Sequence, residues 1–224
     1  MSNSAMLPVN EIFYSIQGES TLAGLPTVFV RLAGCNLKCA WCDTAYALDV
    51  ASGISTTVEE ISDKIAAYKC RYICLTGGEP LIHRQVKELI NLLDYGSQVI
   101  SIETNGSIRV KEFQTARTKM IMDIKCPSSK VPSAYYKAVE RNLPDLEAQD
   151  EIKFVVTESD LEFVEHMLPY CPDVAVLISP VWNHVDLALL VGWLKSNRGK
   201  HPFDNVRIQL QMHKIIWHPM ERGV

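Results

Sequence analysis

The sequence predicts an α/β fold, a compact partial (β/α) barrel with about six to seven mostly parallel strands. Three observations support this prediction. Apolar, β-branched runs alternate along the chain with segments of helical periodicity, which is typical of parallel strands joined by right-handed crossovers. The runs are almost continuously hydrophobic, as expected for strands that are covered on both faces. Polar and glycine residues follow most of the runs, where a barrel places its functional rim.

Seven runs are predicted to be strands, which is too few for a closed eight-stranded barrel. In chain order they are 27–33, 72–76, 99–104, 120–125, 151–156, 174–179 and 206–211. Apolar stripes at helical spacing predict helices marked by Val58, Ile61 and Ile65, by Val86, Leu89, Ile90 and Leu93, and by Leu187, Leu190, Val191 and Leu194. The segment "TTVEE" at 56–60 offers a threonine cap and acidic residues to the first turn of the first of these helices.

The composition is that of an ordinary globular protein, with 224 residues of which 47% are hydrophobic and 21% charged. We expect one domain over residues 1–224, because no Pro/Gly/Ser-rich linker or charge run divides the chain. The net charge of −4 and the scattered basic residues argue against a nucleic-acid partner. No apolar run reaches the roughly 20 residues of a membrane helix. Without a signal peptide the expected location is the cytoplasm, where the seven cysteines are reduced.

Unusual residues gather at the carboxyl ends of six of the predicted strands. In chain order the segments are "GCNLKCAWC", "TGGEP", "ETNG", "DIKCP", "SPVWN" and "QMHK". The carboxyl ends of parallel strands meet at one rim of a barrel, so we expect these segments to build one site.

The first segment carries Cys35, Cys39 and Cys42 at C-x3-C-x2-C spacing. Buried core thiols are one interpretation, but they would not be expected to cluster in this way beside a glycine and a lysine. A structural zinc ion is a second, but it needs four ligands and Asp43 is a poor fourth. A [4Fe–4S] cluster normally takes four thiolates, so three cysteines would leave one iron open to a ligand or substrate.

At this spacing, with Trp41 directly before the last cysteine, the motif resembles the signature of the radical S-adenosylmethionine (SAM) enzymes. In that superfamily the open iron binds the amino and carboxylate groups of SAM. The segment "TGGEP" at 76–80 resembles the Gly-Gly-Glu motif of the same superfamily. Two glycines let the backbone approach closely, and a carbonyl group there can accept a hydrogen bond from the SAM ammonium.

Three further features narrow the resemblance. They are "YSIQGES" at 14–20, Arg31 within the first predicted strand, and "CDTAY" at 42–46. Together they resemble the 7-carboxy-7-deazaguanine synthase family of radical SAM enzymes, and the resemblance extends from "NEIFYSIQGES" to the closing "QMHKIIW".

The resemblance implies a carbon–nitrogen lyase of queuosine and 7-deazapurine biosynthesis. Its substrate, 6-carboxy-5,6,7,8-tetrahydropterin, loses ammonia and contracts to 7-carboxy-7-deazaguanine, with SAM as a recycled radical source and Mg²⁺ assisting. The resemblance also implies a homodimer and a flavodoxin- or ferredoxin-type reductant.

Three residues suit the substrate on chemical grounds. Arg31 can hold the substrate carboxylate through two parallel hydrogen bonds, and a structural ion pair is the alternative for an arginine in an apolar strand. Gln17 and Glu19 offer an amide and a carboxylate to the pterin, where Glu19 can accept from N–H groups. An exposed turn position is the alternative for Gln17.

Further substrate contacts come from the family match. They are the run Ile16, Gln17 and Gly18, much of it through backbone atoms, and Thr76 before the two glycines. Gln211 and His213, on the last predicted strand, would close the substrate pocket. A lone histidine is more often a structural hydrogen-bonding group, and this alternative stays open for His213.

The SAM contacts are also implied by the resemblance. They are Ala40, Trp41, Cys42, Gly78, Asp123, Ile124 and Lys125. Many relatives carry Ser-Pro-Lys where this chain has Asp-Ile-Lys, so a side-chain role for Asp123 stays open. Glu103 and Asn105 are candidate ribose partners or, alternatively, strand-end caps in the turn sequence "ETNG".

Thr44 matches the Mg²⁺ ligand of the family. A single protein hydroxyl is physically reasonable, because Mg²⁺ keeps water molecules and takes oxygens from substrates. From the sequence alone Thr44 would more often be a helix cap, and Asp43 could equally bind the ion. The sequence predicts no separate catalytic side chain.

Two other classes of function remain as alternatives. A radical SAM activase would share the cysteines and "GGEP", but it has no need for Arg31 beside "QGE". A zinc-binding interaction module would need a fourth thiolate or imidazole and no glycine-rich strand end.

Overall fold

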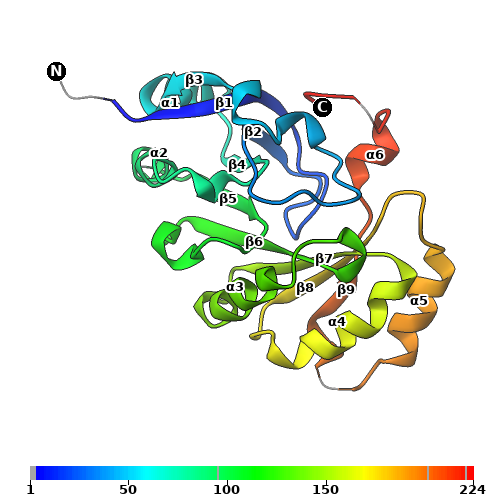
Figure 1. Ribbon diagram of the computed structural model, residues 1–224. Helices are drawn as coiled ribbons and strands as arrows, with labels where there is room; N and C mark the ends of the chain where they lie inside the picture. Colours follow the sequence, from blue (N-terminus) through cyan, green and yellow to red (C-terminus); the bar gives the residue numbers. More distant parts are fainter. Residues whose placement is uncertain (1–3, 95, 201, 220) are drawn as a thin grey trace.

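The computed structural model describes residues 4–94, 96–200, 202–219 and 221–224. The described strands form one sheet of nine, in the order β3-β1-β2-β4-β5-β6-β7-β8-β9. Since β3 and β9 are its two edges, the sheet does not close on itself. Figure 1 shows α1 to α5 along the outer side of the sheet, whereas α6 lies on the other side, near β2. The predicted partial barrel is confirmed.

The strands are β1 (Met6–Ile16), β2 (Pro26–Leu32), β3 (Ile54–Thr57), β4 (Tyr72–Gly77), β5 (Val99–Thr104), β6 (Thr118–Lys125), β7 (Glu151–Val156), β8 (Ala175–Pro180) and β9 (Val206–Ile208). The α-helices are α1 (Val58–Ala67), α2 (Val86–Leu93), α3 (Ala134–Asn142), α4 (Leu161–Met167), α5 (Leu187–Ser196) and α6 (Met212–Ile216). Short 3-10 helices in the connections are η1 (Ala45–Ala47), η2 (Val50–Ser52), η3 (Pro80–Ile82), η4 (Val110–Phe113), η5 (Pro127–Ser129), η6 (Leu143–Asp145), η7 (Glu158–Asp160), η8 (Leu168–Tyr170) and η9 (Phe203–Asn205). None of the described helices has the length and apolar character of a membrane span.

All seven predicted strands are present, as β2 and β4 to β9, and each pairs in parallel with its neighbour in this set. The prediction missed β1 and β3, which add an antiparallel extension: β1 pairs with β2 on one side and with β3 on the other. The predicted start of α1 is confirmed, because Thr57 and Glu60 form a reciprocal capping box.

The parallel strands have one apolar face and one face that carries the functional side chains. In β2, Val28, Val30 and Leu32 pack into the core, whereas Phe29 and Arg31 line a cavity on the other face. This alternation follows from the two-residue period of a strand. The apolar face of the next four strands supplies Ile73, Leu75, Ile100, Ile102, Met120, Met122, Ile152 and Phe154 to the same core.

The last predicted strand is shorter than expected. β9 ends at Ile208, so Gln211 and His213 do not lie on a strand: Gln211 directly precedes α6, and His213 lies within it. The neighbouring strand β8 ends at Pro180, which has no N–H to extend the ladder. The chain instead turns toward the β1–β2 loop, where the Met212 N–H donates to the Gly18 carbonyl oxygen at 3.0 Å.

The predicted buried stripe of α5 is only partly buried. Leu190 is inaccessible, as expected, but Leu187 and Val191 are 45% and 46% exposed. The reason is the position of α5 at the end of the sheet, where it packs against β9, a strand of three residues that offers little surface to cover.

Gly77, at the end of β4, is required by a close backbone approach. Its φ is +146°, and a Cβ atom there would lie 2.1 Å from the Leu32 carbonyl oxygen of the neighbouring strand. We expect Gly77→Ala to lower the free energy of unfolding by about 3 kcal/mol, because the backbone atoms of Leu32 cannot move aside without disrupting β2. Chemical denaturation of the variant and the unmodified protein measures this difference.

Gly192→Ala is the matched control, since a Cβ atom at this position of α5 meets nothing within 4 Å. It should be neutral or stabilising by about 0.5–1 kcal/mol. Equal stability of Gly77→Ala and the unmodified protein would contradict the close approach of β4 to β2.

Candidate active site

A cavity of about 620 Å³ opens at the carboxyl ends of the parallel strands. Its lining comes from the β1–β2 loop, the loop after β2, the ends of β4 to β7, the loop after β8, and α6. The volume lies in the range of small-molecule sites. All six rim segments that the sequence singled out therefore contribute to one cavity, and a second cavity of about 170 Å³ shares part of its lining near the C-terminal residues 221–224.

Cys35, Cys39 and Cys42 all line this cavity from the loop after β2, and all seven cysteines of the chain are free thiols. The loop is hydrogen-bonded to η5, which follows β6: the Ala40 N–H donates to the Ser129 carbonyl oxygen, and the Trp41 indole N–H donates to Ser128 Oγ at 3.1 Å. Burial raises the pKa of Cys39 to about 11. Since metal binding requires thiolates, it would release protons here.

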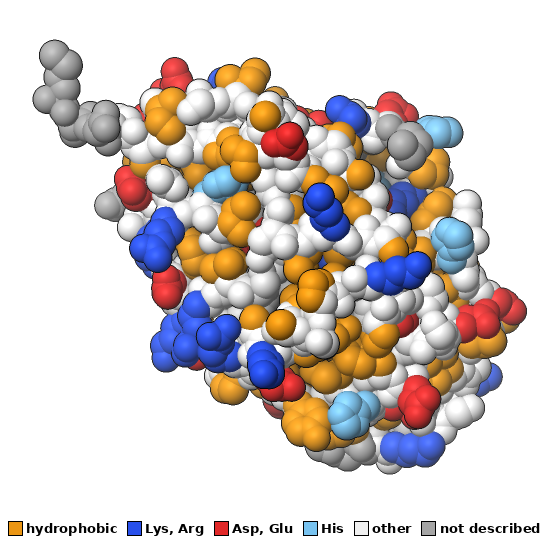
Figure 2. Space-filling model, viewed as in Figure 1, with side chains coloured by type: hydrophobic (Ala, Val, Ile, Leu, Met, Phe, Trp, Pro, Cys, Tyr) orange, Lys and Arg blue, Asp and Glu red, His pale blue; other side chains and the backbone are white. Residues whose placement is uncertain are grey.

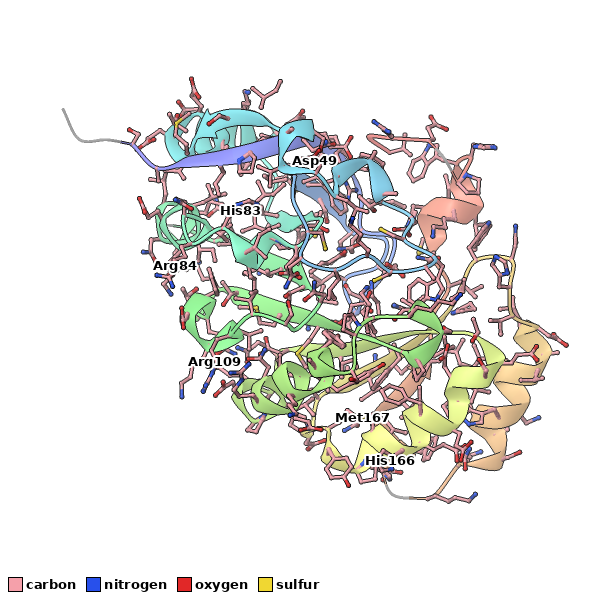
Figure 3. The ribbon with its side chains drawn as sticks, in the orientation of Figure 1. Asp49, His83, Arg84, Arg109, His166 and Met167 are labelled. Carbon is pink, nitrogen blue, oxygen red and sulfur yellow. The ribbon has the colours of Figure 1, made fainter. Side chains whose placement is uncertain are left out.

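The base of the cysteine loop is fixed by two residues labelled in Figure 3. The Nε2 atom of His83, from the loop after β4, lies 2.8 Å from the Ala33 carbonyl oxygen. The Asp49 carboxylate accepts from the Ala51 N–H and starts the short helix η2 that follows the loop. The two ends of the loop are joined directly, because the Gly34 N–H donates to the Ala47 carbonyl oxygen at 2.8 Å.

The second glycine of "TGGEP" packs directly against the cysteine loop. A Cβ atom at Gly78 would lie 2.3 Å from the Gly34 carbonyl oxygen and 2.8 Å from the Cys35 Cβ. The Glu79 N–H donates to the same Gly34 oxygen at 2.8 Å. The two glycines thus bring the backbone after β4 into contact with the loop that carries the thiols, as the sequence predicts.

The donor set fits an iron–sulfur cluster better than a single ion. Among the described residues, no three His, Cys, Asp or Glu side chains form a group that could hold one metal ion. A structural zinc ion needs four ligands around one atom. In an iron–sulfur cluster each thiolate binds a different iron, so three thiols on one cavity wall suit a cluster that leaves one iron without a protein ligand.

The β1–β2 loop lines the same cavity through Gln17, Gly18 and Glu19. Gln17 is 3% exposed, so it is not an exposed turn residue; its Nε2 atom donates to Glu103 Oε1 at 3.3 Å. Glu103 Oε2 in turn accepts from Thr76 Oγ1. At Gly18 a Cβ atom would lie 2.2 Å from His213 Nδ1, so a glycine is needed for α6 to approach. Burial lowers the pKa of His213, which keeps its ring neutral at pH 7.

Arg31 reaches the cavity from β2 and is held by Glu11 of β1. Its Nε donates to Glu11 Oε1 at 2.7 Å, and the same oxygen accepts from the Tyr46 hydroxyl at 2.9 Å. Among the described residues, no ion pair or hydrogen bond engages the two terminal nitrogens of Arg31. The Arg222 guanidinium lies 3.7 Å from the centre of the Tyr46 ring, so the C-terminal segment packs onto this cluster.

Two carboxylates and two ammonium groups form a network on the cavity wall. Lys153 Nζ lies 3.1 Å from Glu19 Oε2 and 3.2 Å from Asp123 Oδ2, and Lys125 Nζ lies 2.9 Å from the same Asp123 oxygen. Burial alone would raise the pKa of Asp123, but Lys125 and Lys153 outweigh it and lower the pKa. Asp123 therefore stays ionised at neutral pH.

Thr44 and Asp43 lie where the two cavities meet. The Thr44 hydroxyl donates to Asp43 Oδ1 at 3.0 Å, and Asp43 Oδ2 is 2.7 Å from Lys214 Nζ of α6. Since Thr44 donates its only hydrogen, its lone pairs remain available to a cation. Asp43 is already paired with an ammonium group.

Known proteins with similar sequences and structures identify the family. The model of the radical SAM superfamily matches residues 29–147. The chain is 37% identical to the 7-carboxy-7-deazaguanine synthase of Chlorobaculum tepidum over 234 residues, covering 100% of both chains. It is 36% identical to that of Methanospirillum hungatei, covering 97% of this chain and 88% of the relative.

The chain belongs to the 7-carboxy-7-deazaguanine synthase family of radical SAM enzymes. Among solved structures, the crystal structure of QueE from Escherichia coli is similar, with a TM-score of 0.70, 25% identity and coverage of 93% of this chain and 95% of that one. Membership in the radical SAM superfamily implies a [4Fe–4S] cluster and SAM, which agrees with the donor set described above.

Most of the site residues predicted from the sequence line the cavity. They are Ile16, Gln17, Gly18, Glu19, Arg31, Thr76, Gln211 and His213 for the substrate, Trp41, Cys42, Gly78, Glu103, Asp123 and Lys125 for SAM, and Thr44 for Mg²⁺. Two do not: Ala40 is exposed, and Ile124 is a core residue. Glu103, predicted for SAM, is hydrogen-bonded to two substrate-side residues, Gln17 and Thr76.

The acidic residue of the Gly-Gly-Glu motif turns away from the cavity. Glu79 is fully buried and accepts from the Thr104 hydroxyl at 2.8 Å and from the backbone N–H groups of Asn105 and Leu81 at 2.6 and 3.0 Å. Burial raises its pKa to about 7 despite these donors. Glu79 therefore links the end of β4 to the end of β5. The Asn105 side-chain oxygen accepts from the Ser107 N–H and forms an Asx turn, which favours a strand-end cap over a ribose partner as the role of Asn105.

Sequence reasoning missed Lys153, Lys214 and Tyr46. A signal for Lys153 was present: it is the one basic residue inside the apolar run "EIKFVV", at a position that alternates with core residues. Lys214 and Tyr46 lie within the segments "QMHK" and "CDTAY", but their roles could not be predicted, because their partners Asp43 and Glu11 lie far away along the chain.

Proposed function

We propose that this chain is a radical SAM carbon–nitrogen lyase that converts 6-carboxy-5,6,7,8-tetrahydropterin to 7-carboxy-7-deazaguanine with loss of ammonia. Full-length similarity to proteins named 7-carboxy-7-deazaguanine synthase supports this function. One observation carries it to this chain's own residues: Arg31 and the Gln17–Glu19 segment share a cavity with the three cysteines. A carboxylate-bearing substrate and a radical source can therefore meet in one place.

The cofactor side of the cavity is the wall with Cys35, Cys39 and Cys42, which would hold a [4Fe–4S] cluster through three thiolates. Bound there, the cluster and SAM supply the radical that takes hydrogen from the substrate. Trp41, Gly78, Asp123 and Lys125, with backbone atoms of Ala40 and Ile124, would contact SAM. The close packing of Gly78 on Cys35 supports this arrangement, because it leaves backbone rather than side chain beside the cluster site.

The substrate side is the wall with Arg31 and the β1–β2 loop. Glu11 holds the Nε edge of Arg31, which leaves the two terminal nitrogens for the substrate carboxylate. Gln17, Glu19 and backbone atoms of Ile16 and Gly18 would bind the pterin ring. Thr76, Gln211 and His213 complete this wall, and His213 in its neutral form can either donate or accept a hydrogen bond.

Mg²⁺ would bind at Thr44, with its remaining ligands supplied by water and by substrate oxygens. The available lone pairs of the Thr44 hydroxyl support this assignment. The pairing of Asp43 with Lys214 disfavours Asp43 as the ligand.

The remaining proposals concern organisation and partners. We propose a single radical SAM domain over residues 1–224, a homodimer, a flavodoxin- or ferredoxin-type reductant and a cytoplasmic location. We also propose that no nucleic acid binds, because the net charge of the chain is −4. On the face seen in Figure 2, one group of Lys and Arg side chains lies at the left edge, and elsewhere both signs of charge are mixed.

Anaerobic turnover tests the function. The cluster is reconstituted, dithionite, SAM, Mg²⁺ and 6-carboxy-5,6,7,8-tetrahydropterin are added, and 7-carboxy-7-deazaguanine is followed by mass spectrometry. We expect product from the unmodified protein and none from Cys39→Ala. A brown protein that cleaves SAM without forming this product would overturn the substrate assignment and favour an activase. A colourless protein would overturn the assignment of an iron–sulfur cluster.

Arg31→Lys tests the carboxylate site. Lysine keeps the charge but can neither bind a carboxylate through two parallel hydrogen bonds nor keep the same contact with Glu11. We expect the KM for the pterin to rise about tenfold or more, with SAM affinity unchanged. Arg117→Lys is the control, because Arg117 pairs with Asp94 at the surface. An unchanged KM in Arg31→Lys would mean that the carboxylate binds elsewhere.

Thr44→Val tests the Mg²⁺ site. We expect EDTA to lower turnover of the unmodified protein and added Mg²⁺ to restore it, and we expect Thr44→Val to lose this response while Thr44→Ser keeps it. Valine has the shape of threonine but no oxygen for the ion. A valine variant that responds to Mg²⁺ like the unmodified protein would rule out Thr44 as the ligand.

A further inference from the structure

Lys153 is a buried lysine on β7, an interior strand of the parallel sheet between β6 and β8. It occupies the third position of β7, and its chain neighbours Ile152 and Phe154 are fully buried in the core. Its own side chain projects from the opposite face and lines the main cavity with only 7% of its surface exposed. A buried ammonium group is costly unless it is paired, so its partners decide what it does.

Those partners come from the two ligand-binding sides of the cavity. Asp123 is the direct cross-strand neighbour of Lys153 on β6, and Glu19 comes from the β1–β2 loop. Lys153 Nζ lies between them, 3.2 Å from Asp123 Oδ2 and 3.1 Å from Glu19 Oε2. One ammonium group therefore contacts a carboxylate predicted for the SAM side and a carboxylate predicted for the substrate side.

The two oxygens of Asp123 are in different situations. Oδ2 forms ion pairs with both Lys125 Nζ and Lys153 Nζ. Oδ1 is buried and has no hydrogen-bond partner among the described residues. A buried carboxylate oxygen without a donor costs free energy, and such atoms mark a place where a ligand supplies the donor. Since Asp123 lines the cavity, this donor would come from a molecule bound there.

We propose that Lys153 is a positioning residue that orients Asp123 and Glu19 for their two ligands. By holding Asp123 Oδ2 together with Lys125, it leaves Oδ1 directed at a hydroxyl or N–H donor of bound SAM. By holding Glu19 Oε2, it leaves Oε1, which accepts from Ser179 Oγ at 3.4 Å, available to the pterin. This assignment rests on the proposed function for the identity of the two ligands.

The charge balance explains why one lysine affects both sites. Lys125 and Lys153 together neutralise Glu19 and Asp123. Without Lys153, two carboxylates would share one ammonium group, and Glu19 would lose its cationic partner inside the protein. Both carboxylates would then be expected to move toward water or toward Lys125, away from their ligand-binding orientations.

Lys153→Met tests this role, because methionine keeps much of the aliphatic volume and removes the charge. Three quantities are measured on reconstituted protein: the melting temperature, the Kd for SAM by anaerobic equilibrium dialysis without substrate, and the KM for the pterin. We expect the Kd for SAM and the KM for the pterin each to rise about tenfold or more. Lys153→Arg, which keeps the charge, should recover part of both losses.

Lys119→Met is the matched control. Lys119 lies on the same strand as Asp123 and pairs with the fully buried Glu151 at 2.7 Å, but it does not line the cavity. Glu151 keeps its hydrogen bonds from Thr21 in this variant. We expect Lys119→Met to lower the melting temperature while changing the Kd for SAM and the KM by less than about twofold.

Two results would overturn the assignment. If Lys153→Met lowers the melting temperature but leaves both affinities unchanged, Lys153 is merely structural. If Lys119→Met weakens both affinities as much as Lys153→Met, the effect is a general loss of structure. Lys153→Gln, which keeps a polar group at this position, replaces the methionine variant if that variant does not fold.

These measurements distinguish a failure of the proposed function from a failure of the role proposed for Lys153. If the unmodified protein makes no 7-carboxy-7-deazaguanine, the substrate identity is wrong, but the comparison of SAM affinities between Lys153→Met and Lys119→Met still decides whether Lys153 positions Asp123.

Discussion

The two-residue period of the parallel strands is the constraint on which the rest of the structure depends. It directs Val28, Val30 and Leu32 of β2 into the core beneath the helices, and Arg31 into the cavity. Because neighbouring strands are in register, the positions that face the cavity align across the sheet. Arg31 lies beside Thr76 of the next strand, and Asp123 lies beside Lys153. A stable apolar layer and a charged cavity wall are therefore two faces of the same strands, and charges can be held inside the molecule because they face one another.

The position of the loop after β2 depends on a second requirement, the close approach of the backbone after β4. Gly77 and Gly78 let the chain after β4 lie against Leu32, Gly34 and Cys35, at distances that no side chain would permit. The cysteine loop thereby gains a rigid neighbour on the cavity side, while η5 holds its outer side through Ser128 and Ser129. Three thiols on an anchored loop beside bare backbone make a place where a cluster can keep one iron open to SAM.

The sequence predicted the parallel strands well, because long apolar runs such as "TVFVRLA" have few other uses. It did not predict β1, whose apolar residues are interrupted by Pro8, Asn10 and Glu11, or β3, which has only four residues. The cavity lining was largely predictable because motifs follow strand ends. The Lys153 network was not, because Glu19 lies 134 residues away in the sequence and only the folded β1–β2 loop brings it to Lys153.

We infer that the chain supplies three cysteines because the fourth iron of a [4Fe–4S] cluster is reserved for SAM. Mössbauer spectroscopy of protein reconstituted with isotopically enriched iron tests it most directly. We expect SAM to change the signal of one of the four irons and to leave the other three nearly unchanged. Four equivalent irons that do not respond to SAM would contradict it, because each would then have its own ligand from the protein.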